Sequence, residues 1–170
     1  MFKNMKKALL FLVALMLMVT FGAQALTLDL EYEGVSMTLP EDFIVALEDD
    51  GDTVSIHMYT AESLDNALFI IGVSAADEVT ADVQADLLKV YEEIADDLHE
   101  AAYEFEDFGE YTFLVVTEGT AAEVIYLTQA HGNLVQITCI ASNGAGLTQA
   151  QTDAVISIVS SLNVKEVPAE

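Results

Sequence analysis

Four acidic side chains surround a single glycine in the first half of the chain. The glycine is Gly51, and the acids are Glu48, Asp49, Asp50 and Asp52. This composition predicts a tight turn. Calcium takes six to eight oxygen ligands, which a turn can supply from carboxylates and backbone carbonyls, although the spacing here is not that of an EF-hand loop. The four acids are therefore a calcium candidate, and a solvated acidic turn is the competing interpretation.

Two more acidic groups occur further along the chain. One is a second cation candidate and contains Glu104, Glu106, Asp107 and Glu110. The other lies on the outer face of a predicted helix and contains Glu92, Glu93, Asp96, Asp97 and Glu100. A hydrolase with paired carboxylates needs two acids flanking a cleft, one of them with a raised pKa. Among 29 acids some pair always looks suitable, so the sequence does not identify such a site.

Nucleophilic and metal-dependent catalysis lack their usual sequence signs. There is no G-x-S-x-G motif, and His57, His99 and His131 show no H-E-x-x-H or similar spacing. Cys139 is the single cysteine, so it cannot form an internal disulfide. It alternates in phase with Ile137, so we expect it to be buried as a small apolar residue. We expect no catalytic residue, and no cofactor apart from the candidate calcium.

The basic residues are concentrated at the start of the chain. Three of the five lysines, Lys3, Lys6 and Lys7, precede the apolar run 8–21, which leads to Ala23-Gln24-Ala25. This is the pattern of a secretory signal peptide that is cleaved after Ala25. All 29 acids follow that point, and two lysines against 29 acids give residues 26–170 a net charge of −27.

These features predict an exported protein. Residues 1–25 are the predicted signal peptide, 26–164 a single domain and 165–170 a frayed tail. The protein would be secreted or otherwise extracytoplasmic. An uncleaved N-terminal anchor is the alternative, because residues 8–25 are apolar or small apart from Thr20 and Gln24. The uninterrupted apolar run is short for a membrane span, which takes about 20 residues.

The charge also restricts the partners. Binding to nucleic acid depends on lysine and arginine, and the predicted mature chain has only two lysines, so nucleic acid is excluded. An anionic membrane surface would repel the chain for the same reason, and we expect no membrane binding after cleavage. A cationic partner, such as a basic protein, a polyamine or a metal ion, is favoured electrostatically. Solubility alone is the competing explanation of the charge.

The first part of the predicted domain is rich in strand patterns. Alternation over 27–33 and 35–39, separated by Glu33-Gly34, predicts a hairpin. A short extended piece is expected over 43–47, and an alternating strand over 53–59. The continuous apolar run 68–73 predicts a central strand that is buried on both faces.

The second part mixes helices and strands. Apolar residues at 83, 87, 90, 94 and 98 predict a long helix from about Ala81 to Ala101, with Thr80 as its N-cap. Strands over 111–117, 121–130 and 134–142 form a predicted antiparallel meander. Thr148 to Gln151 fits a capping box, which predicts a closing helix over about 148–162. The fold class is therefore α+β, an antiparallel sheet flanked by two helices.

A short motif opens the predicted domain, with the sequence Gly34-Val35-Ser36-Met37-Thr38-Leu39-Pro40-Glu41-Asp42-Phe43. Its glycine, alternating hydrophobic residues, proline and aromatic residue resemble the opening of the PsbP-like superfamily. That group includes the extrinsic photosystem subunit and the bacterial DcrB-like exported proteins. The strand 133–139 and the helix 149–162 are similar to the group's closing elements. Phe43 stands where many members carry tryptophan.

The resemblance implies an α-β-α sandwich. It implies roles in binding, assembly or accessory functions, and no catalytic residues. We therefore expect an exported, strongly acidic, non-enzymatic binding or accessory domain with a cationic or protein partner. A calcium-stabilised extracellular module and a hydrolase with paired carboxylates are the alternatives.

Overall fold

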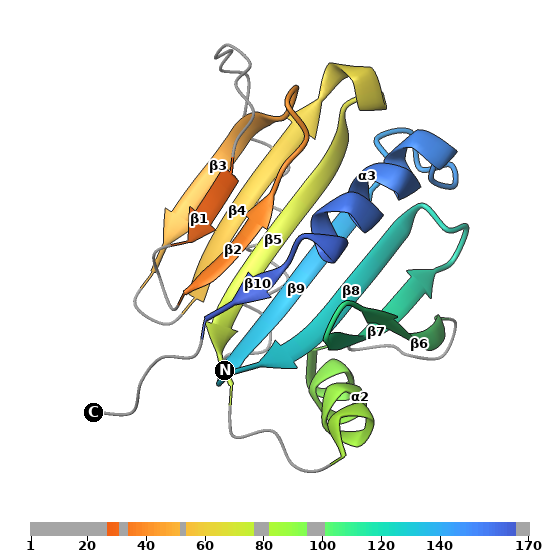
Figure 1. Cartoon of the computed structure of the whole chain (residues 1–170). Helices are drawn as coiled ribbons and strands as arrows, with labels where there is room; N and C mark the ends of the chain where they lie inside the picture. Colours follow the sequence, from red (N-terminus) through yellow and green to blue (C-terminus); the bar gives the residue numbers. More distant parts are fainter. Residues whose placement is uncertain (1–26, 31–33, 52–53, 77–81, 95–100, 166–170) are drawn as a thin grey trace, which may run out of the picture.

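A seven-stranded antiparallel sheet forms the centre of the molecule (Figure 1). The computed structural model describes residues 27–30, 34–51, 54–76, 82–94 and 101–165, so the predicted signal peptide and most of the predicted tail lie outside it. The strands follow the order β3-β4-β5-β9-β8-β7-β6, and β3 and β6 are the outer ones. Their bounds are Ile44–Asp50 (β3), Val54–Ala61 (β4), Ala67–Ala75 (β5), Ala102–Phe108 (β6), Tyr111–Glu118 (β7), Glu123–Ala130 (β8) and Asn133–Ile140 (β9).

A second, three-stranded sheet joins the beginning and the end of the described chain. It contains β1 (Thr27–Leu30), β2 (Val35–Thr38) and β10 (Asn163–Val164) in the order β1-β2-β10. Leu30 pairs with Val35, which confirms the predicted hairpin. Val164 pairs with the same Val35 from the other side, so the last strand of the fold closes on one of the first.

The two helices pack on opposite faces of the large sheet. Alternation along β7 sends Phe113 and Val115 into the larger core, and Leu114 and Val116 into a second core. Helix α3 (Gln149–Ser160) lies along β9 on the first face, beside the small sheet (Figure 1). Helix α2 (Val83–Ile94) packs on β7 and β8 on the second face. The α+β prediction and the predicted meander of β7, β8 and β9 are thereby confirmed.

The central strand β5 differs from its prediction. It lies between β4 and β9, as expected of a central strand. Phe69, Ile71 and Val73 are fully buried in the larger core, whereas Leu68 and Ile70 on the other face are partly exposed. The reason is that α2 lies over β7 and β8, so it does not cover β5.

The predicted long helix is confirmed only in its middle part. Helix α2 begins at Val83, because the Asp82 carboxylate accepts a hydrogen bond from the Ala85 N–H at 3.1 Å. The expected cap Thr80 and residues 95–100 lie outside the described residues. The helix does not reach the predicted end, because the edge strand β6 begins at Ala102. None of the described helices combines the length and the apolarity that crossing a membrane requires.

The C-terminal helix α3 begins as predicted. The Thr148 hydroxyl accepts a hydrogen bond from the Gln151 N–H, and the Gln151 side chain accepts one from the Thr148 N–H at 2.9 Å. This is the expected capping box. The Gln151 amide also donates to the carbonyl of Leu64 at 2.9 Å, which ties the helix to the short 3-10 helix η1 (Glu62–Leu64). Val155, Ile158 and Val159 then face the larger core.

Candidate functional site

The predicted acidic turn is the end of a strand. Glu48, Asp49 and Asp50 are the last residues of β3, Gly51 follows them, and Asp52 lies outside the described residues. Our turn assignment was wrong at these three acids, because the pairing with β4 continues through Asp50.

Strand pairing separates the three described acids. Glu48 pairs with His57 and Asp50 with Ser55, on the face that carries the larger core. Asp49 pairs with Ile56 on the opposite face. In the part of the chain that the structure describes, no three His, Cys, Asp or Glu side chains form a group that could hold a metal ion. The calcium site therefore stays a prediction, and of its described acids only Glu48 and Asp50 lie on the same face of β3.

His57 connects these acids to the core. Its Nε2 lies 2.8 Å from Asp50 Oδ1, and its Nδ1 lies 3.3 Å from Tyr59 Oη and 3.9 Å from Glu48 Oε1. The imidazole is 6% exposed, whereas the side chains of Glu48 and Asp50 are 47% and 59% exposed. The buried histidine therefore lies beneath two half-exposed carboxylates. We call the five residues Glu48, Asp50, Ser55, His57 and Tyr59 the β3–β4 cluster.

The ionisation of the β3–β4 cluster is set by hydrogen bonding and burial. The hydrogen bond from His57 lowers the pKa of Asp50, and the nearby Ser55 hydroxyl lowers it further. Burial raises the pKa of Tyr59 well above its ordinary value, and the charges of Glu48 and Asp50 add to this effect. Asp50 is therefore a carboxylate and Tyr59 a neutral phenol. Because Tyr59 is fully buried, the cluster offers no accessible tyrosine nucleophile.

Ser55 is the unusual member of this cluster. It is fully buried, and its Oγ has no hydrogen-bond partner among the described residues. The hydroxyl lies across from Asp50 in the strand pairing and lowers the pKa of its carboxylate, so Asp50 is its polar neighbour.

The sequence analysis found no metal-binding spacing around His57 and assigned it no role. The signal that could have found the cluster was the hairpin register. A turn placed after Asp50 would have paired Asp50 with Ser55 and Glu48 with His57, as the structure does. The run of acids around Gly51 instead suggested an earlier turn.

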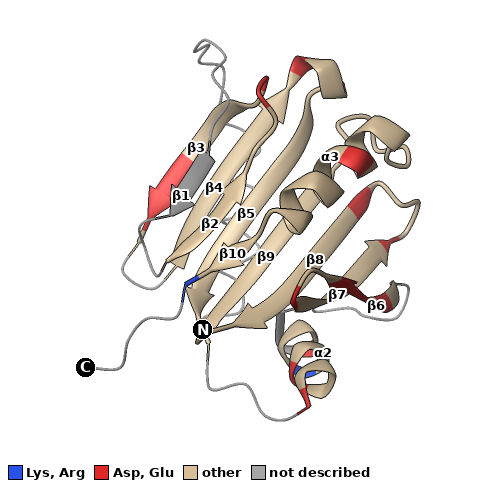
Figure 2. Cartoon of the chain, viewed as in Figure 1, with Lys and Arg blue, Asp and Glu red and all other residues tan. Residues whose placement is uncertain are grey.

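The second acidic group lies on the other outer strand. Glu104, Glu106 and Asp107 belong to β6, Glu110 follows in the β6–β7 turn, and all four are exposed. The two outer strands β3 and β6 both carry acids (Figure 2). Tyr103 on β6 is 55% exposed, the largest exposed fraction among the outward large hydrophobic side chains.

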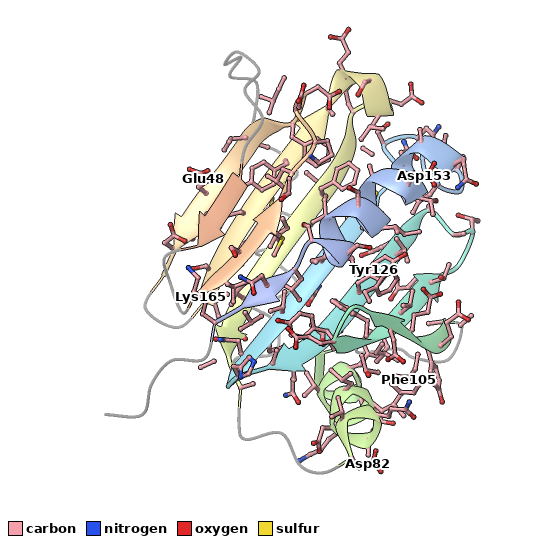
Figure 3. All side chains as sticks on the ribbon, viewed as in Figure 1. Glu48, Asp82, Phe105, Tyr126, Asp153 and Lys165 are labelled. Atoms are coloured by element: carbon pink, nitrogen blue, oxygen red, sulfur yellow. The ribbon has the colours of Figure 1, made fainter. Side chains whose placement is uncertain are left out.

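Aromatic side chains lie beneath the acids of β6. Phe108, Phe113 and Tyr126 pack edge to face, with ring centroids 5.6–6.4 Å apart. Figure 3 shows Tyr126 between α3 and β6, and Phe105 beside α2. Burial raises the pKa of Tyr126 to about 12, with the charges of Glu106 and Glu104 contributing. The charges of these two carboxylates therefore reach Tyr126, one of the aromatic side chains packed under β6.

A third acidic contact was not predicted. Glu118 and Glu123 face each other across β7 and β8, and the Tyr91 hydroxyl of α2 donates to Glu118 Oε1 at 3.3 Å. Burial raises the pKa of Glu123, and the Glu118 charge raises it further. The predicted acidic face of α2 contained five acids. Glu92 is exposed, and the structure does not describe the side chains of the other four.

Cys139 is buried as predicted. It is 0% exposed beside Val135 and Ile137, and burial raises the pKa of its thiol to about 12. His131 is exposed in the β8–β9 turn, and His99 lies outside the described residues. Neither Cys139 nor His131 contributes to the β3–β4 cluster.

Comparison with known proteins identifies a fold. No family model matches the chain, and no curated protein matches it. The solution structure of cyanobacterial PsbP (CyanoP) from Synechocystis sp. PCC 6803 is similar, with a TM-score of 0.52 and 12% identity over 89% of this chain and 99% of that chain. The chain has a PsbP-like fold.

The likeness to PsbP extends over almost the whole of both chains, and at 12% identity it shows the fold alone. It confirms the PsbP-like fold that the resemblance implied. A Bacteroides thetaiotaomicron VPI-5482 structure is also similar, at 11% identity and a TM-score of 0.45 over 78% of this chain. This chain spans 45% of the length of that structure.

Proposed function

We propose that this chain is an exported, non-enzymatic binding or accessory domain that recognises a cationic partner. The predicted leader and the charge of −27 for residues 26–170 support export and a preference for cations. Two of the side chains with nucleophilic atoms, Tyr59 and Cys139, are fully buried and have raised pKa values, which supports a role without catalysis.

The outer strand β6 is the surface that best fits such a partner. Among the strands that the structure describes, it pairs with β7 alone, so the backbone groups on its other side are available to an added strand. Glu104 and Glu106 point to one face of β6, and Tyr103 and Phe105 to the other. An extended segment with lysine or arginine at alternate positions could add to this edge as a strand and pair its charges with the two glutamates. The acidic, unpaired edge of β6 is the observation that carries the proposal.

A direct binding experiment tests this proposal. Calorimetry on the full chain would use an extended peptide with alternating lysine and threonine, at low and at high salt. We expect binding that weakens as salt rises, because screening shortens the range of charge interactions. The double variant Glu104→Gln/Glu106→Gln should bind more weakly. The matched control Glu41→Gln/Glu62→Gln removes the same charge from two other exposed positions and should bind like the parent protein.

Two outcomes would contradict this proposal. Equal weakening in both double variants would mean that the total charge matters and β6 does not. Absence of any salt-dependent binding would leave solubility as the explanation of the charge.

The alternative of a calcium-stabilised module keeps support from one feature, the placement of Glu48 and Asp50 on the same face of β3. Melting of the full chain with calcium, and again after chelation, tests it. A melting temperature that is indifferent to both treatments would remove the calcium hypothesis.

A further inference from the structure

We propose that the apolar run 8–21 of the predicted leader packs on the second face of the large sheet, over β4, β5 and β9, for as long as the leader is attached. Removal of the leader would then open an apolar docking face on the exported protein. This surface is separate from the proposed peptide edge at β6.

The second face of these three strands carries no charge. Strand pairing places on it the side chains at 54, 56, 58 and 60 of β4, at 68, 70, 72 and 74 of β5, and at 134, 136, 138 and 140 of β9. None of them is acidic or basic, although the chain contains 29 acids. Ile56, Leu68, Ile70 and Leu134 are only partly buried there. A continuous apolar surface of this kind marks a place where another segment or protein binds.

Met58 shows that this face has a cover. It is 5% exposed, although its strand neighbours are only Leu47 on β3 and Ile70 on β5. A methionine side chain extends at least as far from a sheet as leucine or isoleucine, so these neighbours alone would leave its end open to water. Helix α2, the described helix on this face, packs mainly on β7 and β8, and β5 and β9 separate β8 from β4.

The distance excludes α2 as the cover of Met58. Three strand spacings of about 4.8 Å place β8 about 14 Å from β4. A helix with its side chains has a radius of only about 5–6 Å. The burial of Met58 therefore depends on residues outside the described ranges.

One segment outside those ranges is long and apolar enough. Four of the others are either two or three residues long or joined to α2, which lies beyond β9 as seen from β4: 31–33, 52–53, 77–81 and 95–100. Segment 166–170 contains two glutamates, whose burial is costly. Residues 1–26 remain, and they include the run 8–21, which has no charged side chain.

The leader also joins the domain in the right place. Thr27 pairs with Thr38, and the chain that follows Thr38 enters the outer strand β3 at Ile44. The six peptide steps from Phe21 to Thr27 span about 20 Å when extended. Two packing layers of about 10 Å each separate the small sheet from a segment on the second face. The run can therefore pass round β3 and lie over β4.

Methionine oxidation of the full chain with dilute hydrogen peroxide, followed by mass spectrometry, tests the proposal. Met58 reports on the second face, and Met37, which is 2% exposed in the larger core, reports on the fold. Because oxidation follows exposure, we expect Met58 to react about tenfold faster in Leu15→Asp/Val19→Asp, with Met37 unchanged. The matched control Asn4→Asp/Gln24→Glu adds the same charge to the leader outside the run and should leave Met58 as in the parent. Cleavage after Ala25 by signal peptidase should have the same effect on Met58 as the two aspartates.

Equal oxidation of Met58 in the parent and in Leu15→Asp/Val19→Asp would overturn the proposal. Protection of Met58 that is lost on dilution would also overturn it, because a second copy of the chain would then be the cover. If Met37 reacts faster as well, the parent chain cleaved after Ala25 decides, and a cleaved chain without a selective gain at Met58 rejects the proposal. The peptide experiment on β6 uses other residues, so either proposal can fail alone.

Discussion

One hydrogen bond fastens the closing strand of the small sheet to the large sheet, and its loss should be measurable. The Val164 N–H donates to Tyr111 Oη at 3.0 Å, in surroundings where Tyr111 and Val164 are only 8% and 5% exposed. The variant Tyr111→Phe keeps the ring and removes the acceptor. A buried N–H without an acceptor costs about 1–3 kcal/mol, so we expect the free energy of unfolding to fall by that amount.

Urea denaturation measures this loss, provided that the slope of the transition stays the same in both proteins. Hydrogen exchange should locate it, with faster exchange at the Val164 amide. Tyr103→Phe is the matched control, because Tyr103 is 55% exposed, so a change below about 0.5 kcal/mol is expected. If Tyr111→Phe were as stable as Tyr103→Phe, with unchanged exchange at Val164, our account of how the two sheets are joined would be refuted.

Three further predictions concern the core, the thiol and the pH dependence. Phe69→Ala removes a fully buried ring that packs 4.6 Å from the ring of Phe43, and should lower the free energy of unfolding by about 3–5 kcal/mol in urea. A smaller loss than that of an exposed Val54→Ala control would contradict the assigned core. Cys139 should resist alkylation at pH 8 in the native protein and react once unfolded, because burial raises its pKa to about 12. Since the folded pKa of Asp50 is lowered, its contribution to stability is present above the ordinary aspartate pKa and is lost as the pH falls through the folded value. Asp50→Asn should therefore be less stable than the parent near neutral pH, and the difference should shrink in urea titrations as the pH is lowered below the ordinary aspartate pKa; a constant difference would contradict this.

The sequence predicted the elements whose signal is local. The alternation from β7 to β9 and the capping box of Thr148 and Gln151 each lie within a short stretch of chain, so they could be recognised without knowledge of the rest. The burial of Cys139 followed from the same alternation.

Features that depend on distant partners could not be predicted in this way. Strand β6 was missed because its alternation, with Glu104 and Glu106 against Tyr103 and Phe105, directly follows a helical pattern. Its place as an outer strand is set by pairing with β7. The half-covered face of β5 depends on where α2 packs, which no local pattern encodes.

The β3–β4 cluster was missed for a more specific reason. Strand pairing has a period of two, so a small error in the position of a turn changes which residues meet. Placing the turn around Gly51 separated Asp50 from His57 in the prediction. The observed register brings them to 2.8 Å.

The pairing of β10 with β2 has a consequence during synthesis. Ser36 and Asn163, which contact each other there, are 127 residues apart. At roughly 5–20 residues per second, translation takes about 6–25 s to deliver Asn163 after Ser36 has been made. Throughout that interval one edge of β2 lacks its β10 partner, and an unpaired strand edge is a template for pairing with another chain. A ribosome stalled shortly before Asn163 should therefore hold a chain that is far more protease-sensitive than the finished one.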